Sequence, residues 1–121
     1  MIVLLTVGTG CASVEVSPPI SSCHNYVVNS GYGRFIIQQA RKGASISWGA
    51  YPNATYSGTY YTASVYANGV KIDGKSQNYA PHASISAARA TKYSGKLLKI
   101  AGNVTKGKDL LLHYEMVCRI M

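Results

Sequence analysis

The sequence predicts an all-β protein, a small antiparallel β-sandwich with about seven or eight short strands. Three observations predict this class. Apolar and polar residues alternate over many short segments, turn residues separate these segments, and no long segment repeats its apolar residues with the period of a helix. The chain has 121 residues, of which 47% are hydrophobic and 13% charged, so one compact domain is expected.

Three short strands are expected in the first half of the domain. Gly31 and Gly33 indicate a turn after the first strand, and the polar Arg41-Lys42-Gly43 segment indicates another after the second. The composition of Tyr51–Gly58 is typical of a loop. The three strands are expected at Cys23–Val28, Arg34–Gln39 and Ala44–Trp48.

The segment Thr59–Ala67 carries the clearest strand pattern. Residues 61, 63, 65 and 67 are expected to share one face of this strand, and residues 60, 62, 64 and 66 the other. Asn68-Gly69 follows, and this pair is the strongest hairpin signal in the chain because both residues tolerate positive φ. Val70–Ile72 is expected to return beside the strand and to end at a turn formed by Asp73-Gly74.

The C-terminal part of the chain predicts a second hairpin. Leu97–Val104 and Asp109–Arg119 are expected to pair around a turn at Thr105–Lys108. The segment Ser84–Tyr93 is a candidate helix, but it is short and contains β-branched residues, so no stable helix is expected there. One face of the last strand is expected to carry Leu110, Leu112, Tyr114, Met116 and Cys118.

These elements favour a sandwich that is immunoglobulin-like or jelly-roll-like in form, with a small closed β-barrel as the alternative. The domain is expected to span residues 23–121, after an N-terminal segment of different character. Neither fold would fix a function by itself.

Residues Met1–Val7 form an apolar run that is typical of an export signal. The run is too short to cross a bilayer, which takes about 20 residues. Small residues follow it, as cleavage requires, but no Lys or Arg occurs before Arg34, so the positively charged start of a signal is missing. We expect a signal peptide over residues 1–12 and a short tether over residues 13–22; a buried first strand is the alternative.

The stretch Thr9-Gly10-Cys11-Ala12-Ser13 resembles the cleavage region of bacterial lipoproteins. In that family a cysteine after small residues receives a diacylglyceryl thioether and becomes the new N-terminus. Gly8 departs from the pattern, which usually has leucine at that position. The resemblance implies lipidation of Cys11, attachment to a membrane through this lipid, and residence in the bacterial cell envelope as an outer-membrane lipoprotein. A soluble secreted form, cut near Ala12 or Ser13, is the alternative.

The chain has three cysteines, and an odd number of cysteines in an exported protein leaves one thiol without a partner. Export with processing at Cys11 would explain this number. If lipidation or cleavage removes Cys11 from the count, Cys23 and Cys118 remain as a pair near the two ends of the domain. A disulfide between them would close a loop of about 95 residues. Two free, buried thiols in a cytosolic protein are the alternative.

Twelve basic residues face four acidic ones, which gives a formal net charge of +8. The excess is concentrated in the C-terminal half, where no acid interrupts the sequence between Arg89 and Lys108. Such a field attracts anionic polysaccharide, lipid head groups or an envelope protein; nucleic acid ranks below these, because an exported protein rarely meets it. A solvated basic face without a ligand is the alternative. The predicted anionic-ligand patch consists of Arg89, Lys92, Lys96, Lys99, Lys106 and Lys108.

Ten tyrosines and one tryptophan are many for this length. An exposed strip of aromatic rings and hydroxyls suits sugar stacking or a protein partner. The protein would then be a secreted carbohydrate- or cell-surface-binding module, or a small toxin or effector; the alternative is that these rings fill half-buried sheet faces. The predicted contact residues for a glycan or partner are Trp48, Tyr56, Tyr60 and Tyr66.

No catalytic constellation is recognisable, so no enzyme activity is expected. The four acids are hard to place as a pair across one cleft, and the serines and histidines lack the strand–Gly-x-Ser-x-Gly–helix context of a hydrolase. The histidines are widely spaced and no Cys-x-x-Cys occurs, so neither a metal nor another cofactor is expected. Asn53 and Asn103 begin Asn-x-Thr sequons, which matter only in a secreting eukaryote.

Overall fold

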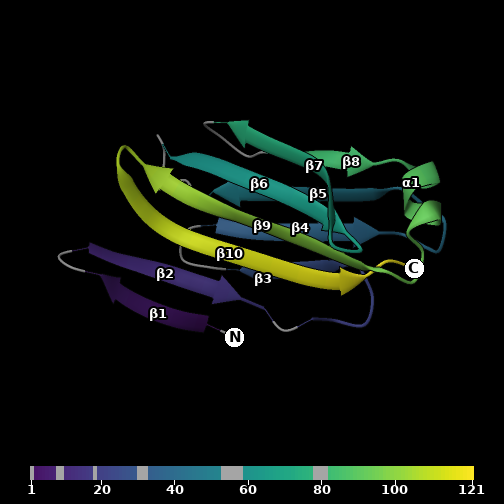
Figure 1. The fold of residues 1–121 in the computed structure, drawn as a ribbon, viewed down its shortest axis with the longest axis horizontal. Helices are drawn as coiled ribbons and strands as arrows, with labels where there is room; N and C mark the ends of the chain where they lie inside the picture. The colour runs from purple at the N-terminus through teal and green to yellow at the C-terminus, as the bar shows by residue number, and fades with distance from the viewer. Residues whose placement is uncertain (1, 8–9, 18, 30–32, 53–58, 78–81) are drawn as a thin grey trace.

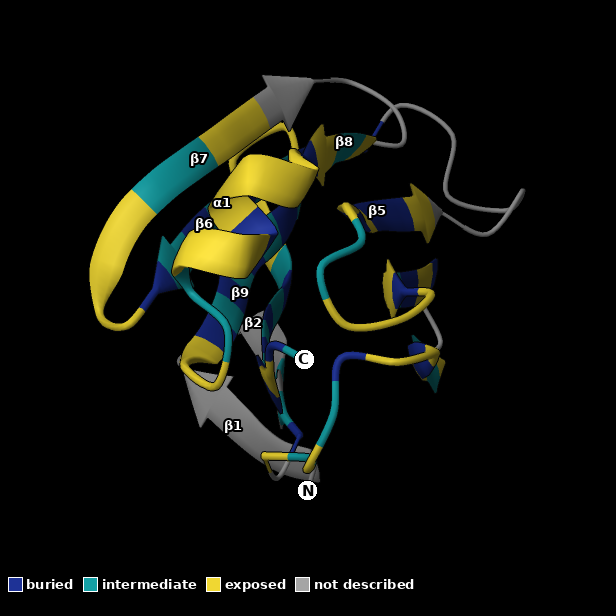
Figure 2. Cartoon of the chain, turned by 90° about the vertical axis from the view of Figure 1, so that its right-hand side faces the viewer, coloured by how far each residue is buried: buried dark blue, intermediate teal, exposed yellow. Residues whose placement is uncertain are grey.

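The computed structural model of the chain describes residues 2–7, 10–17, 19–29, 33–52, 59–77 and 82–121. In these residues two β-sheets lie face to face, and a short helix lies across one end of the gap between them (Figure 1, Figure 2). The predicted small β-sandwich is therefore confirmed. No ladder of paired strands joins the two sheets in the described ranges, so the sheets do not close into the alternative barrel.

The larger sheet has six strands in the order β1-β2-β10-β9-β6-β7 and lies in front in Figure 1. Its neighbouring strands are antiparallel except for β2 and β10, which run parallel. Its strands are β1 (Ile2–Val7), β2 (Gly10–Val16), β6 (Tyr60–Ala67), β7 (Val70–Gln77), β9 (Leu97–Lys106) and β10 (Asp109–Arg119).

The smaller sheet has four strands in the order β3-β4-β5-β8, and all of its neighbours are antiparallel. The helix α1 follows β8 and covers the end of the sandwich that faces the viewer in Figure 2. The elements are β3 (Tyr26–Asn29), β4 (Gly33–Gln39), β5 (Ile46–Pro52), β8 (His82–Ile85) and α1 (Ala87–Lys92).

Alternation along β6 and β10 places their apolar residues in the core, as predicted. On β6 the buried residues are Tyr61, Ala63, Val65 and Ala67, and the residues between them are more exposed. The hairpin after β6 is also confirmed, because Asn68 and Gly69 have φ of 51° and 80°.

The start of β10 differs from the prediction. Leu112 and the alternate residues after it are buried, but Leu110 is 41% exposed. The cause is a register shift between Leu110 and Leu112 in the pairing with β9, which turns the first residues of the strand away from the core.

One tyrosine on β10 fills the space left by a glycine on the neighbouring strand. Tyr114 lies opposite Gly102, where a Cβ would overlap the carbonyl oxygen of Thr62. The Tyr114 hydroxyl donates to that carbonyl at 2.8 Å, and its ring stacks on Phe35 of the other sheet with 4.2 Å between centroids. Burial raises the pKa of Tyr114, so the hydroxyl stays protonated as a donor.

The predicted disulfide between Cys23 and Cys118 is confirmed, with 5.0 Å between the two Cα atoms. Both residues are fully buried. The Cys23 N–H also donates to the Arg119 carbonyl beside β10, and the Cys23 carbonyl accepts from Gln39 N–H of β4. Cys23 therefore joins the two sheets both through its sulfur and through its backbone.

Several predicted boundaries are wrong. β3 and β5 begin later than predicted, at Tyr26 instead of Cys23 and at Ile46 instead of Ala44. β7 continues to Gln77 through Asp73-Gly74, which were predicted to form a turn. Both residues stay in the ladder with β6, where Asp73 lies opposite Val65 and Gly74 lies opposite Ser64. Tyr51 and Pro52 belong to β5 instead of a loop, and the rest of the predicted loop lies outside the described residues.

Helix α1 forms where no stable helix was predicted. The Ser86 hydroxyl oxygen accepts from Arg89 N–H at 3.2 Å and caps the first turn. Ala90 is fully buried against the core. A local cap and tertiary burial therefore stabilise six residues that would not form a helix alone.

The N-terminal residues form an edge of the larger sheet. β1 pairs with β2 alone among the described strands. Described residues of the predicted tether, 13–22, lie beside β10: β2 pairs with it, Ser17 N–H donates to the Glu115 backbone carbonyl, and Ile20 bridges Cys118. The expected export signal over residues 1–12 stays a prediction.

Loss of the disulfide should destabilise the domain strongly. In the chain-entropy model, a bridge that closes a loop of this length contributes about 4–5 kcal/mol to the free energy of unfolding. We expect Cys23→Ser with Cys118→Ser to lower that free energy by several kcal/mol in urea denaturation monitored by circular dichroism. An unchanged denaturation midpoint would contradict the role of the bridge.

Candidate functional site

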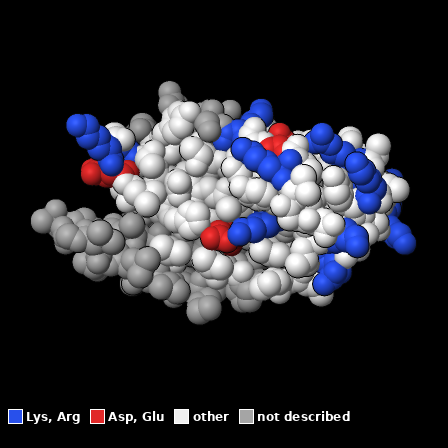
Figure 3. All heavy atoms as spheres, viewed as in Figure 1, with Lys and Arg blue, Asp and Glu red and all other residues white. Residues whose placement is uncertain are grey.

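The strongest concentration of exposed charge lies at the end of the sandwich that carries α1 (Figure 3). Arg89 and Lys92 lie on α1, whose exposed side faces solvent at this end (Figure 2). The Arg89 guanidinium donates to the Ile72 carbonyl at 2.8 Å, which fixes the helix against β7. Lys92 Nζ lies 5.4 Å from the centre of the Tyr93 ring.

The segment after α1 is held by the C-terminal residues. Gly95 N–H donates to the Ile120 carbonyl at 2.8 Å, and Ile120 N–H donates to the Lys96 carbonyl at 2.9 Å. Arg119 Nη1 donates to the Gly95 carbonyl at 2.7 Å. Lys96 and Arg119 are therefore fixed beside each other at the end of β10.

Gln39 brings the turn between β4 and β5 to the same end. The Gln39 side chain is buried; its Nε2 donates to the Ala44 carbonyl at 3.1 Å, and its Oε1 accepts from Met121 N–H at 2.9 Å. The turn also lies beside α1, because a Cβ at Gly43 would be 3.8 Å from Thr91 Oγ1. One buried amide thus ties the turn that carries Arg41 and Lys42 to the C-terminal residues.

We call this surface the basic end. The segments 40–45, 86–97 and 119–121 that build it contain no acidic residue. Asp73 adjoins the basic end, because it follows Ile72, whose carbonyl accepts from Arg89. The Asp73 Oδ1 atom accepts from Gly74 N–H at 2.8 Å. The basic end consists of six exposed side chains: Arg41, Lys42, Arg89, Lys92, Lys96 and Arg119.

Lys99 of the predicted patch does not belong to the basic end. It lies on the outer face of the larger sheet, where its Nζ is 2.9 Å from Glu115 Oε1. The other Glu115 oxygen is 3.0 Å from His113 Nε2, and His113 Nδ1 is 2.7 Å from Asn103 Oδ1. The hydrogen bonds from Lys99 and then from His113 lower the pKa of Glu115. The charge of Lys99 is thus compensated within the sheet.

Lys106 and Lys108 do not join the basic end either. They flank the turn between β9 and β10, at the opposite end of the molecule from α1 (Figure 1), and Asp109 follows them. The ten residues of β9, which begins directly after Lys96 and ends at Lys106, are extended and cover about 33 Å. The structure therefore does not bring the six predicted residues together: three of them lie at the basic end, one is paired, and two lie far away.

The predicted aromatic strip is also divided by the fold. Trp48 is only 3% exposed and lies in the core on β5, so it is excluded from any surface contact. Tyr56 lies outside the described residues. Tyr60 and Tyr66 do face outward from β6, as predicted. Tyr66 lines a groove of about 750 Å³ on the outer face of the larger sheet, together with Leu97 and Val117.

Sequence reasoning missed Arg41, Lys42 and Arg119. Arg41 and Lys42 were assigned to a polar turn, and Arg119 to the last residue of a strand. The signal that could have found them is the disulfide, because Cys118 lies next to Arg119 and brings the ends of the domain together.

Within the described ranges, no group of three or more His, Cys, Asp or Glu side chains is placed to hold a metal ion. The helix found in those ranges is neither long nor apolar enough to cross a membrane. No protein-family model matches the sequence, and comparison with curated proteins finds no significant match.

The Glu115 ion pairs should give the stability of the domain a measurable pH dependence. The pKa of Glu115 is lowered in the folded state, so its contribution is present above the pKa of the unfolded chain and is lost as the pH falls through the folded value. In urea denaturation from pH 7 to pH 2, Glu115→Gln should unfold more easily at neutral pH. The two proteins should converge in acid, and parallel pH profiles would contradict this role.

Proposed function

We propose that this protein is a non-enzymatic binding domain of the bacterial cell envelope, and that its basic end binds an anionic polysaccharide. One observation carries the proposal: six exposed cationic side chains from three separate segments meet at one end of the sandwich. Charges gathered in this way attract a polyanion over a distance and bind several of its carboxylates or phosphates together.

The location of the N-terminal segment favours an anionic polymer as the ligand of the basic end. The alternative ligand is the membrane to which the protein would be anchored. Ser13 lies opposite Leu112 in the parallel pairing of β2 with β10, so Cys11 lies near the start of β10. Arg119 of the basic end lies at the other end of that strand. A lipid on Cys11 would therefore direct the basic end away from the bilayer, while Lys106 and Lys108 would lie on the side of the anchor.

The fold can accommodate the loss of the proposed signal. β1 is hydrogen bonded to β2 alone among the described strands, so cleavage before Cys11 would remove an edge strand without breaking the pairing of β2 with β10. The disulfide also supports export, because such bridges persist in oxidising compartments.

Charge reversal at the two ends of the molecule tests the binding site. With soluble protein and immobilised polygalacturonate as the probe, Lys92→Glu with Lys96→Glu should weaken binding at least about tenfold. Lys106→Glu with Lys108→Glu is the matched control, since it changes the net charge equally at the opposite end, and it should bind like the unchanged protein. Binding should also weaken steeply as salt rises from about 50 to about 200 mM.

Three results would overturn this assignment. Equal loss in both double variants would mean that net charge alone drives binding. Binding to vesicles that contain phosphatidylglycerol, without binding to polygalacturonate, would identify lipid head groups as the partner. Preference for a single-stranded DNA oligonucleotide over both would identify nucleic acid.

The envelope location makes a separate prediction about covalent structure. In the membrane fraction of a bacterial expression host, the intact mass should correspond to a chain that begins at Cys11 and carries a diacylglyceryl group. Reduction should add the mass of two hydrogens for the Cys23–Cys118 bridge. A soluble chain that still begins at Met1 would overturn the export proposal but would leave the polyanion measurement valid.

A further inference from the structure

Tyr51 lies against a glycine on the solvent-facing side of the smaller sheet. It follows Gly49 by two residues on β5, so both residues belong to the same face. A Cβ at Gly49 would lie 2.7 to 2.8 Å from Cε2, Cζ and the hydroxyl oxygen of Tyr51. The ring thus occupies the space of the missing side chain, and Tyr51 is still 40% exposed.

Apolar and aromatic groups continue across the sheet on both sides of this ring. Gly49 pairs with Ile36 of β4 on one side and with His82 of β8 on the other. The His82 ring is nearly parallel to the Tyr51 ring, with an interplanar angle of 18° and 6.4 Å between centroids. Ile36, Tyr51 and His82 therefore present a row of C–H and ring surface across three strands, and the exposed Arg34 of β4 lies beside this row, opposite Tyr51.

A row of polar side chains runs beside the apolar one. Ser47 of β5 pairs with Gln38 of β4 on one side and with Ser84 of β8 on the other. The Gln38 amide donates to Asn25 Oδ1 at 3.3 Å, which extends the row toward β3. Two residues of a strand cover about 7 Å, so this distance separates the polar row from the apolar row. A single sugar ring can therefore contact both rows.

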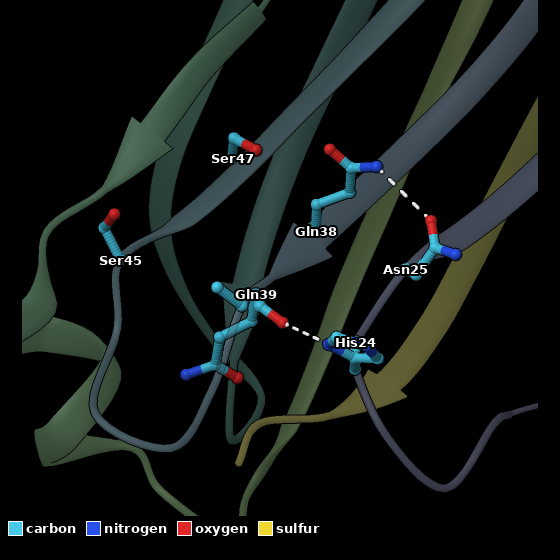
Figure 4. Close-up of a pocket in the computed structure, with 7 residues that line it drawn as sticks. His24, Asn25, Gln38, Gln39, Ser45 and Ser47 are labelled. Carbon is cyan, nitrogen blue, oxygen red and sulfur yellow. Dashed lines mark hydrogen bonds between the residues drawn. The ribbon is translucent and has the colours of Figure 1, made fainter.

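The polar row opens into a hollow of about 490 Å³, shown in Figure 4. Its volume is within the range of small-molecule sites, which is about 300–1,000 Å³. In Figure 4 the Asn25 and Gln38 amides point toward one another, and the His24 ring lies beside the Gln39 carbonyl, 2.9 Å from it. The lining contains no Lys, Arg, Asp or Glu; it consists of His24, Asn25, Gln38, Gln39, Ala40, Ser45 and Ser47.

The apolar row and the polar row match the two kinds of surface on a sugar. A pyranose ring with equatorial substituents has uncovered C–H faces that stack on an aromatic ring, and a rim of hydroxyls that bond to amides and serines. From the two rows and the uncharged hollow, we infer that the outer face of the smaller sheet binds a neutral, β-linked saccharide stacked on Tyr51. The hollow adjoins the basic end at Ala40 and Ser45, but Tyr51 and the two rows lie outside the segments of the basic end, so the inference does not rest on the proposed function.

Nuclear magnetic resonance titration of the full chain with cellohexaose and with chitohexaose tests this site. With at least one of these probes, the amide signals of Ile36, Gln38, Ser47 and Gly49 should shift, and Tyr51→Ala should weaken binding at least about tenfold. Tyr51→Phe keeps the ring and should retain most of the affinity. Tyr60→Ala is the matched control, because Tyr60 is also 40% exposed but lies on the larger sheet.

The inference would be overturned if neither saccharide shifted these signals at millimolar concentration. It would also be overturned if the shifts mapped to Tyr60 and Tyr66, or if Tyr51→Ala and Tyr60→Ala weakened binding equally. Saccharide binding should persist in high salt and in the Lys92→Glu, Lys96→Glu variant, which separates this site from the basic end. Retention of the spectrum of a folded protein in Tyr51→Ala shows that lost binding reflects the missing ring.

Discussion

The covalent bridge between Cys23 and Cys118 is the constraint on which the rest of the fold depends. Cys23 joins the two sheets at this point: its disulfide and its N–H bind Cys118 and Arg119 of β10, and its carbonyl accepts from Gln39 N–H of β4. A sandwich of this size has a limited apolar core, so a long-range bridge that restricts the unfolded chain is a large part of its stability. The same link fixes β4 and β10 beside each other, and both of these strands lead into the basic end.

Sequence patterns predicted the strands whose residues alternate regularly between the core and the exposed face. β6 and β10 each bury one face, so alternation alone indicated which side of each strand faces the core. The short helix could not be predicted in this way, because it depends on the Ser86 cap and on burial of Ala90, which only the assembled sandwich provides. The length of β7 depends on its pairing with β6, which continues to Gln77 and which no local pattern reveals.

The candidate site was harder to predict than the fold, because sequence distance does not translate into spatial distance along a strand. Lys96 and Lys106 are close in sequence, yet an extended β9 places them at opposite ends. Arg41 and Arg119 are distant in sequence, yet the buried Gln39 amide and the C-terminal residues bring them to one surface. The charge excess could be counted from the sequence, but its arrangement required the topology. The pairing of the two cysteines was the exception, since elimination left one partner for each.

Amide hydrogen exchange before and after reduction tests most directly whether the bridge holds the basic end in place. If it does, reduction should accelerate exchange first at the amides of Cys23, Gln39, Gly95 and Ile120, whose hydrogen bonds converge on this region. The amides between β6 and β9 should accelerate less than these four, because their ladder does not involve the bridge and opens only when the whole domain unfolds. Equal acceleration across both sheets, or no change at these four amides, would contradict the account.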